Sequence, residues 1–333
     1  MPARHPPRRV LANLPTPLVR LRRLERELGA RQIWLKRDDM TGLEFSGNKV
    51  RKLEYVVADT FARGCDTLIT EGTPQSNHCR ATAAVCARVG LRCRLLLRPP
   101  PPPGPPQGNH LLDVLFGARI STYDRDEFEQ GRDTIVADVL REERAAGHVA
   151  RFTPMGASEP LGCWGYIRAA AELAEQLGRL RGGCDIVVAI SSGGTYAGLI
   201  LGQLVHHLDD WTLWAVPVSD SAAYHRGHIE RLCRAAIDEF ELPAKYDPAV
   251  VNLIDGYVGA GYAIPYDAAI DAARLLACCE AVVLDPVYTA KAFCAVLDGI
   301  RAGRFGRQRP VVFLHTGGIF SDFAWPELLA SGV

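Results

Sequence analysis

Short apolar runs alternate with longer segments of helical periodicity along nearly the whole chain. The short runs are rich in Val, Ile and Leu, which predicts buried strands. These expected strands cover residues 32–36, 66–70, 92–97, 118–123, 149–153, 185–190, 211–218, 251–254, 281–284 and 311–314. The longer segments predict helices over residues 49–63, 77–89, 125–146, 161–180, 195–206, 222–241, 266–279 and 288–301.

This alternation predicts an α/β protein with mainly parallel, twisted sheets covered by helices on both faces, because parallel strands need right-handed crossover connections. A chain of 333 residues is long enough for two domains. Pro99–Pro106 is expected to form a stiff surface connector. Ligands in such folds bind beyond the carboxyl ends of the strands. The loops of interest there are Glu71–His78, Ser191–Gly198, Asp255–Pro265 and His315–Gly318.

Composition favours a small-molecule partner. Lys and Arg number 38 and so do Asp and Glu, so no net charge attracts nucleic acid or an anionic membrane. No apolar stretch reaches the ~18 residues of a membrane span, and the N-terminus MPARHPPRRV lacks the apolar segment of a secretory signal. We therefore expect a cytoplasmic protein. The ten cysteines contain no Cys-x-x-Cys pair, which predicts buried reduced thiols and no metal site.

The segment Phe45–Glu54, FSGNKVRKLE, predicts a turn followed by a helix, with Asn48 as the N-cap. Lys49 and Lys52 would lie one turn apart on the same helix face. The positive end of the helix dipole disfavours an ammonium group there, so Lys49 is suited to forming a Schiff base with a carbonyl compound. A helix start that carries two solvated lysines explains the segment equally well.

A second candidate is Ser191–Gly198, SSGGTYAG, which follows an apolar strand and opens a helix. Small residues let backbone N–H groups approach a phosphate, and the helix N-terminus adds a favourable dipole. The sequence is neither a Walker A motif nor Gly-x-Gly-x-x-Gly. It predicts a phosphate-binding loop without nucleotide-binding machinery, with a simple tight turn as the alternative.

The third candidate, Gln75-Ser76-Asn77-His78, also follows a strand and opens a helix. Its backbone N–H groups, hydroxyl and amide would bind a carboxylate well. Considered alone, the segment is explained more simply if Ser76 or Asn77 only caps the helix.

Six motifs, in this order, resemble the pyridoxal-phosphate-dependent D-cysteine desulfhydrase and 1-aminocyclopropane-1-carboxylate (ACC) deaminase family: FSGNKVRKLE, EGTPQSNHCRATAA, SSGGTYAG, GAGYAIPYD, LDPVYTAKAF and FLHTGG. The likeness extends from LPTPL to HTGG, nearly the whole chain. It implies the fold-type-II architecture: a large domain of residues 1–51 and 161–333, and a small inserted domain of residues 52–160. The cofactor pyridoxal 5'-phosphate would lie in the cleft between them, and the family suggests a homodimer.

The resemblance also implies roles for individual residues. Lys49 would be the Schiff-base lysine and the base that takes the substrate Cα proton. Tyr262 and Tyr288 look like the tyrosines that family members place over the substrate, although an aromatic side chain can also simply pack in a cleft wall. The other expected cofactor ligands are Lys52, Asn77, Ser192, Gly193, Gly194, Thr195, Thr289 and Thr316. The expected substrate-carboxylate ligands are Ser76, Asn77 and His78. Ser76 is also expected to be catalytic.

Two positions bear on the reaction. ACC deaminases have Glu after Asp-Pro-Val-Tyr and His-Leu before the C-terminal glycine pair, whereas this chain has Thr289 and Thr316, the pattern of D-cysteine desulfhydrases. A carboxylate would keep the cofactor's ring nitrogen protonated, and a hydroxyl gives only a neutral hydrogen bond. The resemblance therefore favours α,β-elimination from a β-substituted alanine, most simply D-cysteine to pyruvate, hydrogen sulfide and ammonia.

Three departures from the family pattern lie close in sequence to the expected pocket: Ser46, Pro74 and Thr82. They leave the leaving group and the stereochemistry open. The alternatives are an ACC deaminase, an L-cysteate sulfo-lyase, a β-replacement synthase of the same fold, and a non-catalytic cofactor-binding module.

Overall fold

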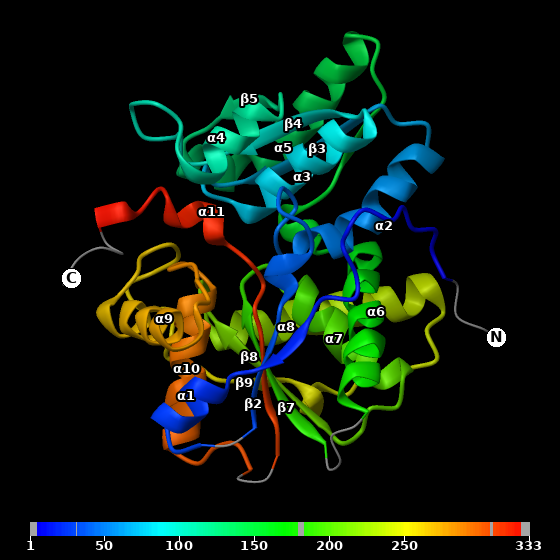
Figure 1. The fold of residues 1–333 in the computed structure, drawn as a ribbon. Helices are drawn as coiled ribbons and strands as arrows, with labels where there is room; N and C mark the ends of the chain where they lie inside the picture. Colours follow the sequence, from blue (N-terminus) through cyan, green and yellow to red (C-terminus); the bar gives the residue numbers. More distant parts are fainter. Residues whose placement is uncertain (1–4, 31, 179–182, 307–308, 328–333) are drawn as a thin grey trace.

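Two mainly parallel sheets flanked by helices build the protein, which confirms the predicted fold class. The structure is a computed structural model that describes residues 5–30, 32–178, 183–306 and 309–327. In Figure 1 the four-stranded sheet with α3, α4 and α5 lies above the six-stranded sheet with α1 and α6 to α10, and α2 and α11 lie between them.

The larger sheet joins both ends of the chain. Its strand order is β1 (Leu18–Arg20), β2 (Ile33–Lys36), β10 (Val311–Leu314), β7 (Cys184–Ile190), β8 (Trp211–Pro217) and β9 (Asn252–Leu253). All neighbours pair in parallel except β1, which is antiparallel to β2. Strand β10 lies between β2 and β7, with Val312 opposite both Trp34 and Ile186. The loops that follow β2, β10 and β7 are distant in sequence, but they therefore meet at the carboxyl ends of these neighbouring strands.

The smaller sheet is built from one continuous part of the chain. Its order is β5 (Arg119–Thr122), β4 (Arg92–Leu97), β3 (Thr67–Gly72) and β6 (Ala150–Phe152), and every neighbouring pair is parallel. The proline-rich segment is the loop between β4 and α4, as expected. The domain limits 1–51, 52–160 and 161–333 remain a prediction.

The eight expected helices are present, with ends within a few residues of those predicted, and α1, α4 and α11 are additional to that set. Their bounds are α1 (Arg22–Glu27), α2 (Lys49–Ala62), α3 (Asn77–Val89), α4 (Gly108–Leu115), α5 (Arg125–Ala145), α6 (Pro160–Leu177), α7 (Gly194–Val205), α8 (Ala222–Phe240), α9 (Asp267–Glu280), α10 (Thr289–Arg301) and α11 (Ile319–Asp322). The expected helix 161–180 ends earlier, at Leu177, and its last two residues lie outside the described residues.

Close helix contacts position the two helices that open at the candidate site. A Cβ added to Gly165 of α6 would lie 2.7 Å from the backbone of Arg51 in α2. A Cβ added to Gly198 of α7 would lie 2.5 Å from the Tyr166 Cβ of α6. Only glycine permits both approaches, so α2 and α7 are held against α6 at fixed separations.

A buried ion-pair cluster anchors α2 beside its functional end. Arg51 donates to both carboxylate oxygens of Asp38, at 2.9 and 2.8 Å, and to both of Glu172, at 2.9 Å each. The side chains of Arg51 and Asp38 are 1% and 0% exposed. Lys36 also contacts Glu172, at 2.5 Å. The cluster ties α2 to the loop after β2 and to α6.

Two expectations from the sequence are wrong. Residues 281–284 do not form a strand: Ala281 is the left-handed C-cap of α9 with φ +54°, and the Val283 carbonyl accepts a hydrogen bond from His315 Nε2 at 2.9 Å. Val282 and Leu284 are buried, so their alternation reflects packing rather than strand pairing. The ten cysteines are free thiols, but Cys278 is exposed rather than buried.

Candidate active site

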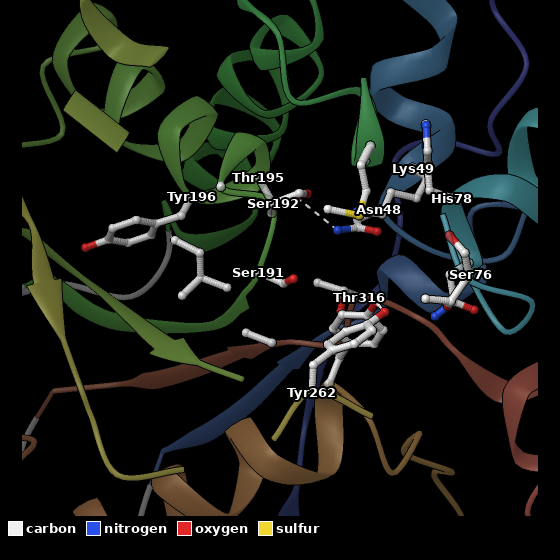
Figure 2. A pocket seen from close by; sticks show the side chains of 18 residues that line it. Asn48, Lys49, Ser76, His78, Ser191, Ser192, Thr195, Tyr196, Tyr262 and Thr316 are labelled. Carbon is white, nitrogen blue, oxygen red and sulfur yellow. Dashed lines mark hydrogen bonds between the residues drawn. The ribbon is translucent and has the colours of Figure 1, made fainter. Parts of the chain in front are cut away.

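One pocket collects the loops that follow strands of both sheets. Thr73 follows β3, Met155 and Gly156 follow β6, Ser191 follows β7, and Thr316 follows β10. The full lining is Asn48, Lys49, Thr73, Ser76, Asn77, His78, Met155, Gly156, Ala189, Ile190, Ser191, Ser192, Gly193, Thr195, Tyr196, Tyr262, Tyr288 and Thr316 (Figure 2). The pocket thus occupies the carboxyl ends of the strands, where ligands of parallel α/β folds bind.

Lys49 is the first residue of α2 and lines this pocket, where its side chain is half-buried. Asn48 holds the N-cap position, but its side chain does not cap the helix; Nδ2 donates instead to Thr195 Oγ1 at 2.9 Å (Figure 2). The turn before it packs on the C-terminal loop, because a Cβ on Gly47, at φ +117°, would lie 2.5 Å from the Thr316 carbonyl oxygen. Burial lowers the pKa of Lys49 to about 8. A substantial fraction of this amine is therefore neutral and nucleophilic near neutral pH.

The glycine-rich segment forms a cup at the start of α7. Gly193 adopts φ +81°, and a Cβ on Gly194 would lie 2.9 Å from Lys52 Nζ and 2.8 Å from Ser158 Oγ. Lys52 Nζ donates to the Gly156 carbonyl oxygen at 3.0 Å. Burial and the nearby Lys49 lower the pKa of Lys52 well below its usual range, so an anion placed beside it would restore its charge. Backbone N–H groups, hydroxyls and this amine suit a phosphate.

Ser158 is a member of the cup that sequence reasoning missed. Its Oγ accepts a hydrogen bond from the Gly194 backbone N–H at 3.1 Å and donates to Ser192 Oγ at 2.9 Å. Met155 and Gly156, in the same loop, were also missed. This loop follows β6, so the rule that ligands lie after parallel strands would have found it if applied to every predicted strand.

The start of α3 forms the opposite wall of the pocket. Ser76 is the N-cap, with Oγ accepting from the Cys79 backbone N–H at 3.2 Å, and it also lines the pocket. Ser76 thus caps α3 and lines the pocket, and its catalytic role remains a prediction. His78 Nε2 pairs with Thr70 Oγ1 at 2.9 Å. Burial lowers the pKa of His78 well below its usual range, so its imidazole is neutral.

Tyr262 and Tyr288 meet at the pocket wall, and their hydroxyl groups are hydrogen-bonded to each other. Their rings pack edge to face, with centroids 5.9 Å apart. Burial raises the pKa of both phenols, so each remains protonated at neutral pH and can donate one hydrogen bond. Loop 255–266 and the residue before α10 thus bring a pair of phenols to the site, of which one donates to the other and one keeps its proton free to donate.

Not every predicted site residue reaches the lining. Thr316 does, but Thr289 does not: its Oγ1 donates to Asp285 Oδ2 at 2.8 Å and accepts from the Asp285 backbone N–H at 2.8 Å. Asp285 also accepts from backbone N–H groups at the start of α10, and this turn draws the Thr289 hydroxyl away from the pocket. Of the two positions that favour a desulfhydrase, only one faces the site.

The three departures from the family pattern lie outside the lining of this pocket. Ser46 Oγ donates to the Asp39 carbonyl oxygen at 3.0 Å, and Thr82 Oγ1 donates to the His78 carbonyl oxygen at 2.8 Å. Both hydroxyls are thus hydrogen-bonded within the protein. Pro74 lies between the lining residue Thr73 and Gln75 and does not contribute to the lining itself.

Comparison with known proteins defines the class. The family model of the pyridoxal-phosphate dependent enzymes matches residues 10–317. The chain therefore belongs to the pyridoxal-phosphate dependent enzymes, and its cofactor is pyridoxal phosphate. The amine of Lys49, whose pKa is lowered, and the cup around Gly194 fit an aldehyde that carries a phosphate.

Closer relatives narrow the comparison. The chain is 42% identical over 323 residues to a D-cysteine desulfhydrase from Salmonella choleraesuis (strain SC-B67), covering 96% of each chain. A solved structure described as an ACC deaminase homologue is 34% identical with a TM-score of 0.87, covering 98% of this chain and 96% of that one. An O-ureido-L-serine synthase shares the fold at 18% identity, with a TM-score of 0.68 and coverage of 96% and 94%.

Proposed function

We propose that this enzyme is a lyase that catalyses α,β-elimination from a β-substituted amino acid, most simply D-cysteine to pyruvate, hydrogen sulfide and ammonia. The observation that carries the proposal is a pocket lysine, Lys49, whose pKa is lowered, beside a glycine cup that adjoins a second, fully buried lysine, Lys52. The relationship to D-cysteine desulfhydrases supports the choice of substrate.

Each group has a task in this proposal. Bound pyridoxal phosphate, held covalently by Lys49, supplies an electron sink that makes the substrate Cα proton acidic. The Lys49 amine, when not bound to the cofactor, would take that proton as general base. Ser76, Asn77 and His78 bind the substrate carboxylate, and Lys52 with the cup residues Ser192 to Thr195 binds the phosphate. Asn77 also bonds the ring hydroxyl, and Thr316 is the hydroxyl that faces the pocket near the C-terminal glycines.

The β-substituent leaves as the Cα proton is removed. The Tyr262–Tyr288 pair can donate a proton to a departing thiolate, since both phenols are protonated. Elimination removes hydrogen sulfide, and addition of one water to the remaining fragment gives pyruvate and ammonia, so atoms balance. A β-replacement synthase would instead need a second nucleophile in the pocket.

A substrate panel tests the reaction. Purified holoenzyme is assayed with D-cysteine, L-cysteine, L-cysteate and ACC, scoring keto acid and sulfide release. The proposal expects the largest kcat/KM for D-cysteine, with keto acid and sulfide formed in equal amounts. A larger value for ACC or L-cysteate, or product only when a second nucleophile is added, would replace it by the corresponding alternative.

Gly194→Ala is expected to weaken binding of pyridoxal phosphate roughly tenfold or more, because the new Cβ would occupy the cup beside Lys52 Nζ. Binding of unphosphorylated pyridoxal should change little. Equilibrium titration of the apoprotein with each compound measures both. Gly131→Ala, in α5 with only ordinary contacts at 3.7 Å or more, is the matched control. If the affinities for pyridoxal phosphate and pyridoxal fell by the same factor, the phosphate would not bind in this cup.

Covalent uptake of cofactor should speed up with pH and level off above about pH 8. Only the neutral amine attacks an aldehyde, and burial lowers the pKa of Lys49 to about 8. Stopped-flow absorbance of apoprotein mixed with pyridoxal phosphate measures the rate. Nα-acetyl-lysine, whose amine has a pKa of about 10.4, provides the reference profile. A protein profile that follows this reference would contradict the assignment.

Tyr288→Phe is expected to lower kcat by roughly 10²-fold while leaving cofactor affinity unchanged, because it removes the hydroxyl bonded to Tyr262 at the pocket wall. Steady-state kinetics and cofactor titration separate the two effects. Tyr123→Phe, in the smaller domain and outside the pocket lining, is the control. An unchanged kcat would assign Tyr288 to packing alone.

We also propose that the chain acts in the cytoplasm as a homodimer, with residues 52–160 forming a domain inserted into the other. No helix in the described part of the chain is long and apolar enough to cross a membrane.

Helices α4 and α11 are in contact; α4 exposes Leu111 and Leu115, at 47% and 71%, and Phe323, directly after α11, is 66% exposed. A second copy covering these side chains explains their exposure. Light scattering of wild type and Leu115→Glu tests the dimer: the variant should be monomeric.

A further inference from the structure

Asn109, the second residue of α4, joins the start of α3 to a buried arginine. Its side chain is fully buried. Nδ2 donates to Asn77 Oδ1 and to the Gln75 carbonyl oxygen, each at 2.9 Å, and Oδ1 accepts from Arg80 Nε at 3.2 Å. The Gln75 side chain closes the same network, because its Oε1 accepts from the Asn109 backbone N–H at 3.0 Å.

The direction of these hydrogen bonds is set by Arg80. A guanidinium group only donates, so Asn109 must turn its oxygen toward Arg80 and its NH2 group toward Asn77. The Asn77 oxygen is then occupied by Asn109. The NH2 group of Asn77 is the end of this amide left for the pocket that Asn77 lines.

Arg80 itself is well suited to hold this direction. It is fully buried, and burial lowers its pKa to about 10, an effect that nearby Asp113 opposes, so it stays protonated at neutral pH. Its other nitrogens donate to the carbonyl oxygens of Glu44 at 2.7 Å and Ser46 at 2.8 Å. These residues form the turn that leads into Lys49, so one guanidinium orients both walls of the pocket.

We propose that Arg80 and Asn109 are positioning residues that force Asn77 to present its NH2 group, a hydrogen-bond donor, to the bound cofactor. The inference rests on the proposed function, in which Asn77 bonds the ring oxygen of pyridoxal phosphate. An ionised ring oxygen is an acceptor, so the reversed amide would face it with a second acceptor and lose the bond.

Asn109→Asp tests whether Asn109 sets the direction of the hydrogen bonds to Asn77. The change is nearly isosteric, and the carboxylate can pair with Arg80, but it cannot donate to Asn77 Oδ1. The dissociation constant of pyridoxal phosphate from the apoprotein should rise roughly ten- to hundredfold. In an Asn77→Ala background, which has no amide to orient, the same change should have no further effect. Gln203→Glu, whose amide bonds the Leu208 and Trp211 carbonyl oxygens instead, should bind like wild type.

The double-mutant cycle separates positioning from general structural damage. If Asn109→Asp raises the dissociation constant equally in both backgrounds, or leaves it unchanged in the wild-type background, the inference is overturned. Circular dichroism melting identifies a variant that fails to fold, and Asn109→Ala, which also lacks the donor, then takes its place in the cycle. If the wild-type protein bound no pyridoxal phosphate, the proposed function itself would be overturned. That outcome differs from an additive cycle, which would overturn only the positioning role of Asn109.

Discussion

Lys49→Ala is expected to abolish covalent binding of pyridoxal phosphate and to lower turnover of D-cysteine by roughly 10²–10⁴-fold from the lost proton transfer alone. Lys49 lies at the first position of α2 and lines the pocket. Burial leaves its amine partly neutral, with a pKa of about 8, so it can both attack an aldehyde and accept the Cα proton. Visible absorbance that survives gel filtration measures cofactor retention, and sulfide release measures turnover.

The matched control for this variant is Lys245→Ala, because Lys245 is exposed and lies outside the pocket lining. It should retain colour and full turnover. Lys52 is the residue most able to replace Lys49, since both lie on one face of α2 and burial lowers the pKa of both amines. A coloured, active Lys49→Ala protein would therefore move the covalent role to another lysine and contradict the assignment.

Arg51→Met should lower the free energy of unfolding by about 3–5 kcal/mol, the typical cost of removing one partner of a buried ion pair. Asp38 is 0% exposed and would lose two charge-assisted hydrogen bonds, at 2.9 and 2.8 Å. Glu172 would lose two more. Urea denaturation of the apoprotein measures the change without a contribution from bound cofactor.

An exposed pair of the same chemical type provides the comparison. Arg63, 65% exposed, contacts Asp59 at 2.7 Å one turn earlier in α2. Arg63→Met should cost less than ~1 kcal/mol, as surface ion pairs do. If Arg51→Met and Arg63→Met lowered the free energy of unfolding by the same amount, the cluster around Arg51 would not be what anchors α2.

The sequence was informative where function depends on local structure. Lys49, Ser76 and the glycine cup each follow a turn or strand and open a helix, and that arrangement can be read from a short segment. Their roles remain predictions, although the structure brings them into one pocket. The alternation of strands and helices likewise predicted the fold class, because its cause is the packing of each element on one sheet.

Other features depend on contacts between distant segments and could not be predicted from a single sequence. Ser158 reaches the cup only because β6 and β7 end near each other, and Asn109 reaches Asn77 across α4 and α3. Thr289 faces Asp285 rather than the pocket because the turn before α10 uses both groups. The apolar alternation at 281–284 reports burial, which a loop and a strand can share.

Borohydride reduction of the holoenzyme, followed by peptide mass mapping, tests the assignment of the site most directly. Reduction fixes the cofactor onto the amine that holds it. The pocket geometry predicts one labelled peptide, with the added mass on Lys49. A label on Lys52 or Lys291, or no label on any lysine of a catalytically active preparation, would contradict it.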